Sequence, residues 1–215
     1  MKSKYLRLCK FMYIFSLLFL VNGCFLTYYS AKVLPKGESE GGTGLGLGYE
    51  YTISQGHLIK ESISSSYDQS ILFVRKGIGH KMDIGFDIGL LYMSFDVRKQ
   101  ILDESKYVPA VSVSGNAIIY TNVLGVGAGP GISLQLSKGD FFSNSKFSYI
   151  YYSGSDFWSG YRYSLNMLML AESIGYEAHI YKHFYMVPLV GMIYKKNLNG
   201  DSLIDVILGI SFLFR

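Results

Sequence analysis

Cysteine and charged residues are both scarce in this chain of 215 residues. It has two cysteines, Cys9 and Cys24, and 17% of its residues are charged. Cys9 lies in a segment that we expect to be removed, and the single remaining cysteine can neither form an internal disulfide nor supply the several ligands of a metal site. The hydrophobic share of 49% excludes a disordered chain, and the length fits one domain.

Basic residues exceed acidic ones only at the N-terminus. The formal net charge is +4, and it equals the contribution of Lys2, Lys4, Arg7 and Lys10, which have no acidic neighbour. The other 16 basic residues match the 16 acidic residues in number. Because no basic stripe or cluster remains, the sequence predicts no binding of nucleic acid.

The first 24 residues have the layout of a secretory leader. A basic stretch precedes an apolar run at residues 11–21, which is too short to span a bilayer, and Gly23 follows as a small residue before Cys24. Residues 21–24 read Val-Asn-Gly-Cys and resemble the lipobox of bacterial lipoproteins. That resemblance implies cleavage before Cys24 and acylation of its thiol. Acyl chains such as palmitate would then anchor the new N-terminus at about 0.8 kcal/mol per buried CH₂.

The leader also fits two simpler interpretations. It is either an ordinary signal peptide with an incidental cysteine or an uncleaved anchor that continues through residues 25–31. The lipoprotein interpretation divides the chain into a signal peptide at residues 1–23, a lipidated tether at 24–42 and a β-barrel domain at 43–215.

The mature part alternates apolar and small or polar residues with a period of two, as β-strands do. In residues 82–92 one side of the strand holds Met82, Ile84, Phe86, Ile88, Leu90 and Tyr92, and the other side holds Asp83, Gly85, Asp87 and Gly89. Strand-like runs occur at residues 43–53, 68–76, 82–92, 107–120, 122–137, 146–153, 165–182, 184–195 and 203–214, with 158–163 as a possible tenth. Single-chain bacterial barrels have even strand numbers, so we predict an all-β, antiparallel up-and-down barrel of eight strands, or alternatively ten.

The apolar face of these strands is predicted to meet lipid. The opposite face holds mostly glycine, serine and isolated acids, and it lacks the dense Lys and Glu of a solvated surface. The inward acids Glu50, Asp83, Asp87 and Asp205 are expected to pair with inward Arg or Lys, because a charge held in a lumen must be paired or hydrated. A soluble barrel with an apolar core is the alternative.

The mature chain resembles the small outer-membrane barrels of the OmpA and OmpX types in this alternation and in its aromatic C-terminal strand, residues 210–215 (ISFLFR). Such barrels usually end on the aromatic residue, whereas this chain ends on Arg215. Residues 107–137 carry no charge and form the main alternative, a membrane helix, but their many Gly, Ser and Asn residues favour two strands joined near Tyr120.

No motif predicts a cofactor or a metal, and the spacing of His179 and His183 alone does not make a metal site. The weak catalytic candidates are Ser173, Glu177 and His179, which alternate onto one side of one strand. We predict an outer-membrane, lipid-anchored monomer with a structural or surface-interaction role, whose loops at residues 140–146 and 153–161 face an envelope or host partner. The alternatives are a barrel-embedded membrane enzyme, a carrier of a small hydrophobic ligand and a soluble lipoprotein.

Overall fold

The computed structural model describes residues 30–54, 57–60, 70–89, 92–122, 125–155, 162–198, 200 and 202–215. The predicted signal peptide and Cys24 lie outside the described residues, as do residues 158–161 of the possible tenth run. The described chain forms twelve strand segments: β1 (Ser39–Ser54), β2 (His57–Lys60), β3 (Ser70–Gly79), β4 (Met82–Gly89), β5 (Tyr92–Leu102), β6 (Ala110–Asn122), β7 (Gly125–Lys138), β8 (Phe141–Ser155), β9 (Arg162–Tyr176), β10 (Ala178–Tyr181), β11 (Phe184–Asn197) and β12 (Ser202–Phe214).

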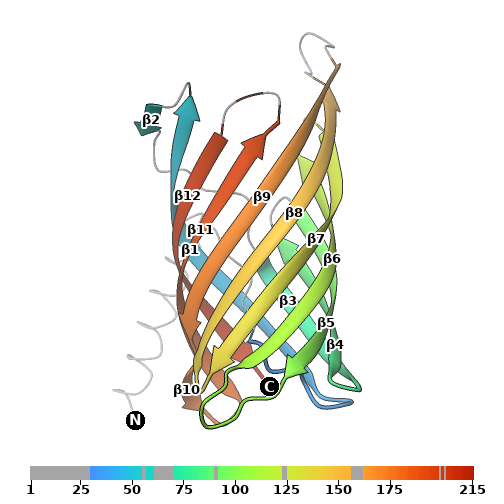
Figure 1. Ribbon diagram of the computed structural model, residues 1–215, viewed down its shortest axis with the longest axis vertical. Coiled ribbons are helices and arrows are strands. Elements are labelled where there is room, and N and C mark those ends of the chain that lie inside the picture. Colours follow the sequence, from blue (N-terminus) through green and yellow to red (C-terminus); the bar gives the residue numbers. More distant parts are fainter. Residues whose placement is uncertain are drawn as a thin grey trace, which may run out of the picture.

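These strands close into a barrel (Figure 1). Each barrel strand pairs antiparallel with its neighbour, β12 pairs with β1, and β11 pairs with both β9 and β12. The short segment β2 folds back antiparallel beside the end of β1, and β10 follows β9 and pairs with β11, so ten strands make the wall. The prediction of eight strands is therefore wrong, and the alternative of ten is confirmed.

The strand that the sequence prediction missed is β5. Its inward positions hold Ser94, Asp96 and Arg98, which are all buried. In the sequence this charged stretch resembles a solvated loop, because the alternation of a strand is easy to see only when one face is apolar and the other is small. Residues 82–92, predicted as one run, instead contain β4 and the first residue of β5.

The outside of the barrel is apolar and the inside is polar where the sequence predicted it. On β4, Phe86 and Ile88 are each 39% exposed, whereas Asp83 and Asp87 are 0% and 1% exposed. Exposed and buried positions alternate in the same way on β12 and β7, although the inward side of β12 holds Ile207 and Leu213 as well as Asp205 and Ser211. This arrangement confirms the predicted lipid-facing side and is the reverse of what a soluble barrel requires.

Residues 107–137 contain all of β6 and all of β7 except Lys138, and these two antiparallel strands pair from Ala110–Ser137 to Asn122–Gly125. The prediction of two strands is confirmed. In the described residues, no helix is long and apolar enough to cross a membrane.

Side chains fill much of the lumen, and inward glycines make room for them. A Cβ atom on Gly175 would lie 2.2 Å from the ring of Phe142, and one on Gly42 would lie 2.5 Å from the ring of Phe73. One region of the lumen is filled by apolar side chains alone. These are buried residues of β6, β8, β9, β11 and β12: Ile118, Ile150, Met169, Ala171, Leu189, Ile193 and Ile207. We call this set the apolar cluster.

Candidate functional site

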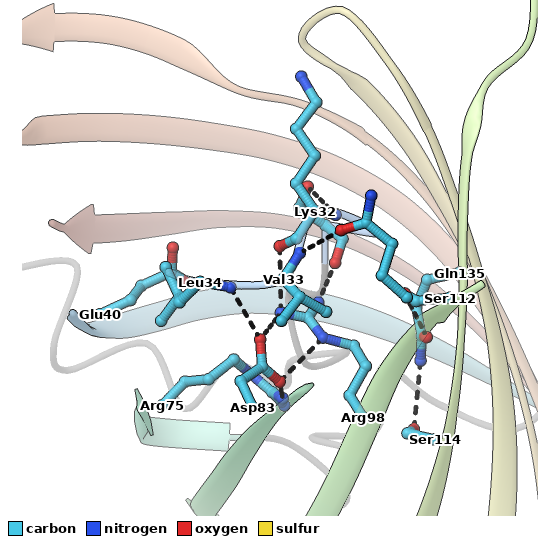
Figure 2. A network of polar contacts seen from close by, with 12 residues as sticks. Lys32, Val33, Leu34, Glu40, Arg75, Asp83, Arg98, Ser112, Ser114 and Gln135 are labelled. Carbon is cyan, nitrogen blue, oxygen red and sulfur yellow. Dashed lines mark hydrogen bonds and ion pairs between the residues drawn. The ribbon is translucent and has the colours of Figure 1, made fainter. Parts of the chain in front are cut away.

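A network of buried ion pairs occupies one end of the lumen (Figure 2). Asp83 on β4 accepts hydrogen bonds from Arg75 Nη1 at 2.5 Å and from Arg98 Nη2 at 2.5 Å. Arg75 Nη2 also donates to Asp96 Oδ1 at 2.7 Å. The four side chains are at most 4% exposed, so each charge depends on the others for compensation.

The local sequence explains why these groups meet. They stand at inward positions of the consecutive strands β3, β4 and β5, and Asp83 is directly opposite Arg98 in the register. Gly85 lies between them on the inner surface. A Cβ atom there would lie 2.5 Å from Arg75 Nη2 and 2.4 Å from Asp96 Oδ1, so the absence of a side chain leaves the space that the ion pair fills.

This network holds the N-terminal segment inside the barrel. The backbone N–H of Leu34 donates to Asp83 Oδ2 at 3.2 Å, and that of Val33 donates to the side chain of Gln100 at 3.1 Å. Arg98 donates to the carbonyl oxygens of Ser30 and Lys32 (Figure 2). Asp83, Arg98 and Gln100 therefore bind the backbone of the segment, so these contacts do not depend on which side chains the segment carries.

The rest of the segment lies against the backbone of β3. Gly77 exchanges hydrogen bonds with Gly37 and Glu38, each at 2.9 Å, and a Cβ atom on Gly77 would lie 2.0 Å from the carbonyl oxygen of Pro35. Only glycine allows this close approach. We call residues 30–38 the plug; it lies within the predicted tether, whose last residues, 39–42, are the start of β1.

A second, exposed set of contacts joins the plug to the turns at this end. Lys32 Nζ lies 3.0 Å from Glu104 and donates to the carbonyl oxygen of Gly139 at 2.8 Å. Glu104 also accepts a hydrogen bond from the N–H of Gly139 at 2.9 Å. This N–H, and then Lys32, lower the pKa of Glu104 below its ordinary value of 4.5.

Arg215 closes the same end from the C-terminus. It pairs with Glu40 on β1 and, at 2.8 Å, with Glu177 between β9 and β10, and its guanidinium lies 5.1 Å from the ring centre of Tyr185. Burial lowers the pKa of Arg215, but Glu40 and Glu177 outweigh that effect and raise it above its ordinary value. The residue that departs from the aromatic ending of such barrels thus links β12 to the first strand.

The inward acids behave largely as predicted. The prediction of ion pairing is confirmed for Asp83 and for Asp205, which lies 2.9 Å from Lys195 Nζ. Asp87 is buried and interacts electrostatically with Lys146 on β8. The side chain of Glu50 lies outside the described part of the structure.

The three catalytic candidates occupy different surroundings. Ser173 is buried at an inward position of β9, and Glu177 is bound to Arg215. His179 is exposed on β10, where its Nε2 lies 2.7 Å from the carbonyl oxygen of Lys182. Among the described residues, no hydrogen bond connects any two of the three, so the polar network that the sequence suggested does not form.

In the described ranges, no group of three or more His, Cys, Asp and Glu side chains is placed to hold a metal ion.

The residues of β5 that bind the plug and Arg75 were not predicted from the sequence. Asp96, Arg98 and Gln100 alternate along β5, and this period of two in a charged stretch was the signal that could have revealed them.

A closed antiparallel barrel with an apolar exterior and ion-paired interior is a transmembrane β-barrel, because closure leaves no unpaired strand edge to face lipid. No protein-family model matches the chain, and no curated protein matches it.

Three solved structures show the same general architecture at low similarity. The attachment invasion locus protein Ail of Yersinia pestis is 13% identical, covers 84% of this chain and 100% of its own, and has a TM-score of 0.31. The same protein in complex with the heparin analogue sucrose octasulfate is 14% identical, covers 82% of this chain and 99% of its own, and has a TM-score of 0.31. The translocator domain of the autotransporter NalP from Neisseria meningitidis is 9% identical, covers 85% of this chain and 89% of its own, and has a TM-score of 0.35. At these values neither protein's activity transfers to this chain.

Proposed function

We propose that this chain is an outer-membrane β-barrel lipoprotein with a structural or surface-interaction role. The observation that carries the proposal is the filled lumen. The plug and its ion pairs occupy one end, and in the apolar cluster Ile150 and Ile207 have no exposed surface. A barrel filled in this way is suited to anchor loops at the cell surface, and it offers no wide passage for solutes.

The turns indicate the orientation. Three two-residue turns, at residues 80–81, 139–140 and 182–183, lie at the end that also holds the plug and Arg215 (Figure 1). Short turns face the periplasm in bacterial outer-membrane barrels. The opposite end, where β8 and β9 are joined by residues 156–161, is then the outer one.

This orientation corrects the predicted pair of outward loops. Residues 140–146 and 153–161 flank the two ends of the same strand, β8, so they cannot both face the cell surface. Residues 141–146 belong to β8 itself, and Asp140 stands in a turn at the plug end. The proposed surface role therefore falls on the segment after β8, residues 156–161, which lies outside the described residues.

The proposed lipid anchor fits the plug end. Cys24 precedes Ser30 by six residues, a stretch that spans at most about 20 Å. An acylated Cys24 would thus be confined to the leaflet that faces the periplasm, with the plug fixing the chain between the anchor and β1.

Two epitope tags test the orientation and role. We expect an antibody to bind intact cells when the tag replaces residues 157–160 and not when it is inserted between Gly139 and Asp140. Radioactive palmitate should label the wild-type chain and not the Cys24→Ala variant, while both migrate faster on gels before boiling, as closed barrels do. Binding to the turn tag, or equal labelling of both chains, would contradict the proposal.

A further inference from the structure

One acidic side chain stands on the lipid-facing surface, four residues before the C-terminal end of its strand. Glu172 is at an outward position of β9, between Leu170, which is 39% exposed, and Ile174, which is 59% exposed. Its neighbour on β11 is Met192, which is 40% exposed. Within the described strands, it is the one outward acid that apolar residues flank on both sides along the strand.

The depth of Glu172 follows from the aromatic residues of β8. Phe141 and Tyr151 are exposed on the outer surface, ten residues apart. In a strand tilted by 35–45°, ten residues rise about 25 Å, the height of the apolar band of an outer-membrane barrel. Ser145, directly opposite Glu172 in the register, is four residues from Phe141, so the carboxylate lies about 10 Å inside this band.

The barrel satisfies this carboxylate only in part. Ser145 Oγ donates a hydrogen bond to Glu172 Oε2 at 2.6 Å, and in the described residues it is the single partner of Glu172. Hydrocarbon chains offer no hydrogen-bond donor, and an ionisable residue at this depth is costly unless another group pairs with it. A partner that places a hydrogen-bond donor next to Glu172, on the outer surface of β8 and β9, would therefore stabilise this carboxylate in the membrane.

A complementary group stands on another face of the same barrel. Lys76 is an exposed, outward residue of β3, with the exposed Ile78 and Val74 on either side of it along the strand. It lies four residues from His80 in the β3–β4 turn, and Ser145 lies five residues from Asp140 in the β7–β8 turn at the same end of the barrel. Lys76 and Glu172 thus have similar depths in the membrane on different faces.

We propose that two copies of this chain associate in the membrane, with Lys76 of one copy donating to Glu172 of the other. The two faces differ, so the contact is heterologous and repeats from copy to copy along a row or ring. It replaces the monomer expected from the sequence. The inference rests on the part of the proposed function that places the apolar outer surface in lipid, and not on acylation of Cys24. A result against acylation would therefore leave the association untouched, and a monomeric protein would leave the proposed acylation untouched.

The experiment measures the mass of the full-length protein in a mild detergent by light scattering over a range of protein concentrations. We expect wild-type oligomers, and about tenfold or greater weakening of association in Glu172→Lys and in Lys76→Glu. The double variant with both charges exchanged should regain association, which no merely structural effect of either change would produce. A lipid-soluble carbodiimide should join peptides containing Lys76 and Glu172 in the wild type.

Lys99→Glu is the matched control, because Lys99 is another exposed, outward lysine, on β5. The heat-dependent gel shift of each variant shows that its barrel has closed, and only variants that shift are compared. A wild-type protein that is monomeric at every concentration would overturn the proposal. So would normal association of Glu172→Lys, a double variant that stays monomeric, or a loss with Lys99→Glu that Lys76→Glu does not show.

Discussion

Two regions of the filled lumen, the plug end and the apolar cluster, are built in opposite ways. At the plug end, Asp83 receives hydrogen bonds from Arg75, Arg98 and the backbone of Leu34, and each contact has a fixed direction and a named partner. In the apolar cluster, residues such as Ile150 and Ile207 are buried by contact alone. The first region is specific and costly to disturb, because losing one member leaves charges unpaired. The second tolerates change in proportion to the volume removed.

Removing the carboxylate of Asp83 should have the largest effect. The Asp83→Ala change removes the carboxylate partner of buried Arg98, takes one of its two carboxylate partners from buried Arg75 and frees the N–H of Leu34, so we expect a loss of about 4 kcal/mol in the free energy of unfolding. Urea unfolding in detergent micelles measures it. Asp140→Ala, in an exposed turn, should change the value by less than about 0.5 kcal/mol. Equal effects of the two changes would mean that the network does not hold the plug end together.

A smaller loss is expected in the apolar cluster. Ile207→Ala removes three carbons from a fully buried site, and the cavity should cost about 3 kcal/mol in the free energy of unfolding, whereas Ile207→Val should cost about 1 kcal/mol. The same urea titration measures both. The contrast with the plug end would be lost if the valine variant were as unstable as Asp83→Ala.

Overpacking tests the fit between glycine and aromatic side chains. Gly175→Ala places a methyl group on the ring of Phe142 and should destabilise the barrel by about 2 kcal/mol. In a Phe142→Leu background the same change should cost less, because the smaller side chain can move aside. A double-mutant cycle of unfolding free energies therefore gives a coupling between the two sites, and simple additivity would contradict the assigned contact.

The smallest effect is the pH dependence of the exposed contacts around Glu104. Its pKa in the folded protein is lowered, so its contribution to stability is present above the ordinary pKa of 4.5 and is lost as the pH falls through the lower folded value. The stability difference between wild type and Glu104→Gln should thus be constant near neutral pH and shrink below about pH 4.5. It should stay under about 1 kcal/mol, because the group is near the surface. A difference that grew at acidic pH would contradict this sign.

The sequence predicted the strands whose two faces differ in character. In β4 the apolar outward residues alternate with Asp83, Gly85 and Asp87, and that pattern predicted the strand and the lipid-facing side correctly. The same reasoning did not find β5, because its inward residues Asp96 and Arg98 are charged and are compensated only by Arg75 and Asp83 of the neighbouring strands. Pairing across strands is a property of the register, and a single strand does not show it.

The plug was hidden for a different reason. Its contacts use the carbonyl oxygens of Ser30 and Lys32 and the N–H groups of Val33 and Leu34, and every residue other than proline offers both groups. A segment bound through its backbone leaves little trace in composition, so residues 30–38 read as a polar tether. Similarly, Glu172 gives no signal until the barrel shows which side of β9 faces lipid.

The place of the plug in the chain has a consequence for the order of assembly. The side chains that bind its backbone, on Asp83, Arg98 and Gln100, all come from strands in the first half of the sequence. A growing sheet of β1 and β3–β5 can therefore pair Arg75, Asp83, Asp96 and Arg98 around the plug before the later strands arrive. The final seam, from Gly41–Phe214 to Ile53–Ser202, then encloses an ion-pair network that is already complete, whereas Asp87 and Glu40 wait for Lys146 and Arg215 of the later chain.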